Sequence, residues 1–182
     1  MTPEKPTKAT RDLRNAVVTG DVPAILDALA KGADINHKDA SGAPALLDAV
    51  TRGFTAVVQL LLHNGADPNI HLWGLPSNTI LKWAIRSGQP ASAVLLLRGG
   101  ADPSDVWVLK TAAECRMAAV VDALISRGAD VNAVSSDGTA MMAAAYCGNV
   151  SMVQFLLDHD ADPNPETNCQ PTADPSQALA VV

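Results

Sequence analysis

The sequence predicts an all-α fold in which about five helix-turn-helix units are stacked into a solenoid, instead of one closed globular core. A five-residue phrase recurs along the chain, and a glycine precedes most copies of it at a fixed distance. In addition, 48% of the residues are hydrophobic while only 3% are aromatic, so Ala, Leu and Val dominate the apolar content. Such side chains suit closely packed helices better than the aromatic-rich strands of a sandwich or barrel.

The recurring phrase is Gly-Ala-Asp-x-Asn, and its first copy is Gly32-Ala33-Asp34-Ile35-Asn36. The five copies, some of them imperfect, begin at Gly32, Gly65, Gly100, Gly128 and Asp160, so the intervals between them are 33, 35, 28 and 32 residues. A period of this length is typical of repeat proteins, in which each unit packs against its neighbours in the chain. Binding is therefore the function that the format favours.

A second glycine lies 12 residues before most copies of the phrase, at Gly20, Gly53, Gly88 and Gly148, whereas Arg116 takes this position in the fourth unit. The apolar segment between the two positions predicts a helix of two to three turns, ended by a residue in the left-handed conformation that glycine adopts most easily. Another short helix precedes the first glycine and carries a Leu-x-x-Ala core. Its pairs are Leu13 and Ala16, Leu46 and Ala49, Leu81 and Ala84, Leu109 and Ala112, and Met141 and Ala144.

This pattern resembles the ankyrin repeats. Their usual motif, Gly-x-Thr-Pro-Leu-His-x-Ala followed by Val-x-x-Leu-Leu-x-x-Gly-Ala-Asp-x-Asn, is echoed by Gly42-Ala43-Pro44-Ala45-Leu46-Leu47-Asp48-Ala49 and by Thr79-Ile80-Leu81-Lys82-Trp83-Ala84. The resemblance covers residues 10–164 and implies β-hairpin loops, called fingers, and a concave face that binds a partner protein. No unit keeps the Thr-Pro-Leu-His tetrad intact, so we expect apolar stacking to carry more of the stability.

The expected organisation is a flexible segment at 1–9, an ankyrin repeat domain at 10–164 and a proline-containing segment at 165–182. The units are expected at about 10–37, 38–70, 71–104, 105–132 and 133–164. Three alternatives stay open for the last segment: it covers the open end of the solenoid, begins a truncated sixth unit or is disordered.

The fourth unit is shorter than the others. Gly100 and Arg116 are 16 residues apart, while the matching stretches in the second, third and fifth units have 21, 23 and 20. The missing residues fall in the loop that would form the finger, so we predict a gap in the row of fingers at this unit. The third unit has extra residues around Leu72 and Trp73.

Charge and cysteine content limit the class of partner. The net charge is −6 and basic residues are scattered, which argues against nucleic acid and favours a basic partner surface. No stretch approaches 18 continuous apolar residues, so we expect neither a membrane span nor a membrane partner. Three cysteines without a CxxC pair indicate a reduced, cytoplasmic setting, and we expect Cys115 and Cys147 to be half-buried and unbridged.

The sequence predicts no enzyme and no cofactor or metal site, because nucleotide-binding, metalloprotease and hydrolase motifs are absent from it. The aspartates of the recurring phrase repeat with the unit, so we expect them to organise loops through bonds to local backbone. The alternative is a small-molecule sensor or an enzyme with a pocket at the truncated fourth unit, walled by Trp73, Trp107, Glu114 and Cys115.

The family resemblance implies that partner-binding residues lie on the fingers and on the first helix of each unit. The third and fourth units are the irregular ones and contain every tryptophan, the residue type most enriched in binding hot spots. The residues that we expect to bind the partner are Trp73, Leu75, Asn78, Arg52, Arg86, Trp107, Glu114 and Tyr146. Self-association through the weakly capped C-terminal end is a further alternative.

Overall fold

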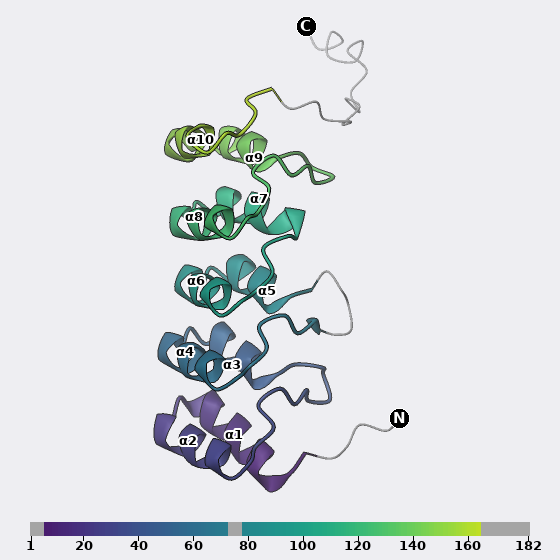
Figure 1. Ribbon diagram of the computed structural model, residues 1–182, viewed down its shortest axis with the longest axis vertical. Helices are drawn as coiled ribbons and strands as arrows, with labels where there is room; N and C mark the ends of the chain where they lie inside the picture. Colours follow the sequence, from purple (N-terminus) through teal and green to yellow (C-terminus); the bar gives the residue numbers. More distant parts are fainter. Residues whose placement is uncertain (1–5, 73–77, 165–182) are drawn as a thin grey trace, which may run out of the picture.

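The computed structural model describes residues 6–72 and 78–164, and ten α-helices lie in these ranges. The helices form five pairs that are stacked in chain order (Figure 1). Their bounds are α1 Lys8–Thr19, α2 Val22–Ala30, α3 Ala45–Thr51, α4 Thr55–His63, α5 Ile80–Arg86, α6 Pro90–Arg98, α7 Val106–Glu114, α8 Ala118–Ser126, α9 Ala140–Tyr146 and α10 Val150–Leu157. The predicted all-α solenoid of about five helix-turn-helix units is confirmed.

Two layers of helices run along the stack. The odd-numbered helices form one layer, from which the long loops project, and the even-numbered helices form the other (Figure 1). Each helix contacts its partner in the pair, and successive helices of the odd-numbered layer contact each other from α1 to α9. We call the odd-numbered helices the inner layer and the even-numbered helices the outer layer; the long loops project on the side of the inner layer (Figure 1).

The core repeats from unit to unit as the sequence predicts. Both members of every Leu-x-x-Ala pair are buried in the inner layer. In the outer layer, Leu61, Leu96, Leu124 and Leu156 occupy the same position in successive units, and each is 0% exposed. Burial of a leucine side chain contributes about 2 kcal/mol, so these repeated contacts supply the main stabilisation of the stack.

The turns after the helices also follow the prediction. The positions expected to be left-handed all have positive φ, including the two that are not glycine, Arg116 at 58° and Asp160 at 63°. A residue with a side chain costs roughly 1–2 kcal/mol in this conformation. The stacking of the fourth and fifth units therefore holds these two residues against their own backbone preference.

Three loops form fingers closed by an isolated antiparallel bridge. The bridges are Lys38 with Pro44 in the second unit, His71 with Thr79 in the third and Ser135 with Gly138 in the fifth. In the fourth unit, residues 101–105 lead directly into α7 without such a bridge, and the structure describes all of them. The predicted gap in the row of fingers is confirmed.

The beginning of the first unit lies slightly earlier than expected, because α1 begins at Lys8 and the hydroxyl of Thr7 accepts a hydrogen bond from the Thr10 N–H at its N-terminus. The expectations for residues 165–182 lie outside the described residues, as do those for 1–5.

Asparagine side chains connect the loops of neighbouring units. Asn36 donates from Nδ2 to the carbonyl of Gly65 at 3.1 Å, and its Oδ1 accepts from the Asp67 N–H at 2.8 Å. Asn69 makes the same two bonds to the third unit, and Asn132 makes them to the fifth. The asparagine of the recurring phrase is therefore a clamp between units, in addition to the loop-organising aspartates beside it.

This clamp is missing between the third and fourth units, where Ser104 takes the place of asparagine. Its hydroxyl donates to Asp102 within its own loop at 2.9 Å. No described side chain bridges the Gly128 carbonyl and the Asp130 N–H, the two atoms that an asparagine would join. A hollow of about 370 Å³ lies between the two loops at this point, lined by these residues among others.

We expect Ser104→Asn to raise the free energy of unfolding by about 1 kcal/mol, because it adds two hydrogen bonds between units in exchange for one within a loop. Denaturant unfolding followed by circular dichroism measures the change. The reverse substitution, Asn69→Ser, removes an existing clamp and should lower stability by a similar amount. A Ser104→Asn protein that is no more stable than the parent would contradict this role of the asparagine.

Candidate functional site

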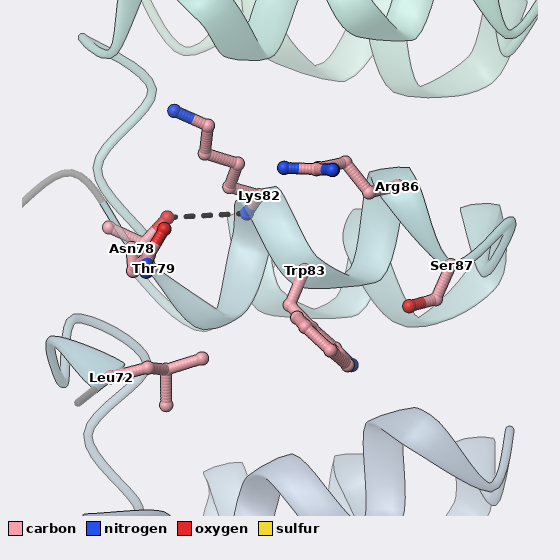
Figure 2. A pocket seen from close by; sticks show the side chains of 7 residues that line it. All are labelled: Leu72, Asn78, Thr79, Lys82, Trp83, Arg86 and Ser87. Carbon is pink, nitrogen blue, oxygen red and sulfur yellow. Dashed lines mark hydrogen bonds between the residues drawn. The ribbon is translucent and has the colours of Figure 1, made fainter.

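Two hollows lie side by side on the inner layer at the third and fourth units. The first has a volume of about 320 Å³ and lies between the base of the third finger and α5 (Figure 2). Leu72 and Asn78 line it from the finger, and Trp83 lines it from the helix. The Leu72 N–H donates to the Asn78 carbonyl at 2.7 Å, and this bond fixes the base of the finger.

The second hollow has a volume of about 510 Å³ and lies between α5, α7 and the fifth finger. Trp107 and Glu114 line it from α7, and Asp137 lines it from the finger. Lys82 and Arg86 line both hollows, so the two form one continuous surface. We call this surface the α5–α7 groove; it consists of Leu72, Asn78, Thr79, Lys82, Trp83, Arg86, Ser87, Trp107, Lys110, Thr111, Glu114 and Asp137.

Trp107 is a half-buried aromatic residue that lines the second hollow. It lies in the first turn of α7, where Asp105 is the N-cap and accepts a hydrogen bond from the Trp107 N–H at 3.0 Å. The Nζ atoms of Lys82 and Lys110 lie 5.7 and 5.6 Å from the centre of its ring. Two cation–π contacts therefore hold the orientation of this ring, while part of it stays exposed.

The two lysines are also held by carboxylates. Lys110 is only 8% exposed, and its Nζ lies 2.7 Å from Glu114 Oε1 and 3.9 Å from Asp137 Oδ2. Lys82 Nζ lies 3.4 Å from Asp105 Oδ2. Since these pairs come from three successive units, the charges connect the third, fourth and fifth units across the groove.

Trp83 extends on the opposite side of α5 from Lys82 in Figure 2, toward the second unit. It is half-buried, and its indole Nε1 donates to the hydroxyl of Thr51 at 3.1 Å. This tryptophan therefore connects α5 to α3 through a hydrogen bond.

Of the eight residues expected to bind the partner, the structure brings four to this groove: Asn78, Arg86, Trp107 and Glu114. Arg52 is exposed beyond the end of α3, and Tyr146, 95% exposed, ends α9; neither lines the groove. Trp73 and Leu75 lie outside the described residues.

Sequence reasoning missed Lys82 and Lys110. The spacing of Lys110 from Glu114, four residues along a predicted helix, could have indicated an ion pair. The contacts of both lysines with Trp107 join different units or depend on the orientation of its ring, and no local pattern contains that information.

A second charged cluster fixes the finger of the second unit. Arg14 on α1 lies 2.8 Å from the carboxylates of both Asp39 and Asp48, and it donates to the Ala43 carbonyl at 3.0 Å. Asp39 also accepts hydrogen bonds from the backbone and hydroxyl of Ser41 and from the Ala43 N–H. One arginine therefore ties this finger to the first unit.

The described residues offer little for catalysis or metal binding. Among them, no group of three or more His, Cys, Asp or Glu side chains could hold a metal ion, and no helix is long and apolar enough to cross a membrane. Cys115 and Cys147 are unbridged as expected. Cys147 is half-buried as expected, but the expectation for Cys115 is wrong, since it is exposed; both cysteines follow the last residue of their helix.

A model of ankyrin repeats (three copies) matches residues 13–106 and 108–173, which is most of the chain. This match agrees with the stacked helix pairs, the fingers and the asparagine clamps. The chain belongs to the ankyrin repeat family. Its repeats are units of a kind that generally serves protein–protein interaction, and the family is usually non-catalytic.

Curated relatives share the repeats but are far longer. The ankyrin chain is 35% identical over 128 residues, 68% of its length, to ankyrin repeat and SAM domain-containing protein 6 of Danio rerio, of which it covers 16%. It is 26% identical over 140 residues, 72% of its length, to an ankyrin repeat and KH domain-containing protein of Caenorhabditis briggsae, of which it covers 5%. The similarity therefore concerns the repeats and not the whole of either protein.

The cluster around Asp39 gives the ankyrin stack a pH dependence. Burial by itself raises the pKa of this carboxyl, but hydrogen bonds from Ser41 and Ala43 and the charge of Arg14 outweigh it and lower the pKa below its ordinary value. A carboxyl with a lowered pKa in the folded state stabilises the fold above its ordinary pKa, near 4, and this contribution is lost as the pH falls further.

We expect Asp39→Asn to reduce the loss of stability between about pH 4 and pH 2, because the variant has no carboxylate to protonate there. Urea unfolding at several pH values measures the slope. The same substitution at Asp122, an exposed residue of α8, is the matched control. Equal slopes for the two variants would show that the Arg14 cluster contributes nothing to acid sensitivity.

Proposed function

We propose that this ankyrin repeat chain is an interaction module, acting as a scaffold, adaptor or inhibitor, that binds a partner protein through the α5–α7 groove. The observation that carries the proposal is the position of Trp107, which is held by two lysines but remains partly exposed in a hollow of about 510 Å³. A rigid aromatic ring in a concave surface gives much contact area at little cost in entropy.

The shape of the neighbouring units supports this location. The fourth unit has no finger, so none lies between the fingers of the third and fifth units. Leu72 and Asn78 at one border and Asp137 at the other line the groove, which places helices and fingers on one surface. Binding across several units is the mode that the stacked architecture favours.

The enzyme and sensor alternative has less support. Glu114 is paired with Lys110, and Cys115 does not line the hollow, so the described residues bring no acid and base together there. Trp73, the other wall of the pocket in that hypothesis, lies outside the described residues.

The net charge of −6 supports a partner with basic surface outside the groove, because long-range attraction follows net charge. Free thiols at Cys115 and Cys147 support a reducing, cytoplasmic setting. Self-association remains a prediction as well: Tyr146 and Val150, exposed at 95% and 78%, give the last described unit apolar surface. Light scattering over a range of concentrations tests it, and a strict monomer at high concentration would exclude it.

We expect Trp107→Ala to weaken capture of the partner from an extract of the native cell by about tenfold or more, as truncation of a central aromatic residue does at protein interfaces. Circular dichroism checks that the variant remains folded. Tyr146→Ala is the matched control, since it truncates an exposed aromatic residue of the inner layer outside the groove. Undiminished capture by Trp107→Ala, or loss only in Tyr146→Ala, would contradict the proposed site.

A further inference from the structure

The charges of the α5–α7 groove differ in sign from the charge of the chain as a whole. Three of its lining side chains are cationic, Lys82, Arg86 and Lys110, and two are anionic, Glu114 and Asp137, so the lining carries a net charge of +1. Lys110 is neutralised by Glu114 and Asp137, and Lys82 lies near Asp105. Arg86 is exposed and forms no salt bridge with any described residue, so a positive charge stays uncompensated in the middle of the groove.

Arg86 also lies beside another cation. It is four residues from Lys82, and the two side chains extend from the same side of α5 in Figure 2. Like charges at this spacing on a helix repel each other. Lys82 pairs with Asp105 at 3.4 Å, longer than the roughly 2.7–2.9 Å of a strong charge-assisted hydrogen bond, and its ammonium has further N–H donors for a second carboxylate. A carboxylate placed between the two cations would remove the repulsion.

We infer that the α5–α7 groove recognises an acidic peptide segment of its partner, in which a carboxylate binds Arg86 and Lys82 and a neighbouring apolar side chain packs on Trp107. This inference rests on the proposed function and specifies the chemistry of its partner. The planar guanidinium of arginine presents paired donors that match a carboxylate, and the exposed position of Arg86 leaves them accessible.

Trp107 determines which kind of side chain the peptide can have next to its carboxylate. Its ring is part of the same lining as Arg86, so one short segment can reach both. Because Lys82 and Lys110 already lie over the Trp107 ring, a basic side chain would meet two positive charges at this position. The groove therefore disfavours a basic segment at the point of contact, although net charge by itself favours a basic partner.

These two effects act over different distances. At physiological ionic strength, charges farther apart than about 8 Å are largely screened. The net charge of −6 then influences how often the partner approaches, whereas Arg86 and Lys82 determine which side chain is bound. A partner with basic surface and one acidic apolar segment satisfies both.

The test is selection of phage-displayed random twelve-residue peptides on the full chain. We expect the enriched peptides to contain Asp or Glu next to an apolar residue, and synthetic copies to bind in fluorescence anisotropy. Binding should weaken at least fivefold in Arg86→Gln and less in Arg86→Lys, which keeps the charge but loses the paired donors. Arg52→Gln is the matched control, since Arg52 is an exposed arginine at the end of α3 and does not line the groove.

The outcomes separate this inference from the proposed function. If the enriched peptides have no acidic residues but need Trp107 for binding, the inference of an acidic segment is overturned. The groove would then still be supported as a protein-binding site. Acidic peptides that bind Arg86→Gln and Trp107→Ala as tightly as the parent would overturn both. A single-stranded oligonucleotide that binds through Arg86 and displaces the peptides would overturn the inference in favour of phosphate recognition, and failure to enrich any peptide would overturn a linear segment as the ligand.

Discussion

The whole structure depends on contact between successive units. Its helices are 7 to 12 residues long, and helices of this length are marginal by themselves in water. Each becomes stable only when the buried face it shares with its neighbours is covered, and the repeated leucines and alanines of the two layers provide that cover. A residue that weakens one junction therefore affects the units on both sides of it.

Hydrogen bonds determine the register of this stacking. The apolar contacts are non-directional, so they favour close packing without fixing how far one loop is displaced along the next. The asparagine clamps supply that information, because one side chain bonds to both a carbonyl and an N–H of the following unit. Buried alanines then allow the helices to approach closely at a defined position.

The junction of the third and fourth units departs from this regular arrangement in two ways, because it has neither a finger nor an asparagine clamp. The same junction contains Asp105, which caps α7 and lies near Lys82 on α5. The ion pair of Lys82 and Asp105 thus connects two units where the asparagine clamp is absent. The α5–α7 groove lies beside this junction, and its charged side chains belong to the units on both sides.

The sequence by itself determined the fold, because stacking requires the same residue types at the same positions in every unit. The roles of Gly32 and Leu61 can be predicted from the repeat alone. Gly32 follows a helix and has positive φ, and Leu61 is buried at a position that recurs in successive units. The missing finger was equally visible, since it changes a spacing that can be counted. The family resemblance led to the prediction of Asn78, Arg86, Trp107 and Glu114 as partner-binding residues, and these four line the groove.

Only the tertiary structure decided which of those residues share a surface and what charge that surface has. Lys82 and Trp107 belong to different units, and Lys110 and Asp137 likewise, so their proximity depends on the separation and rotation of neighbouring units. The net charge is a sum over the whole chain and says nothing about where the charges lie. It suggested a basic partner, whereas the groove presents an arginine, Arg86, without a salt bridge to any described residue. Electrostatic preference is a property of short distances between side chains, and stacking alone fixes those distances.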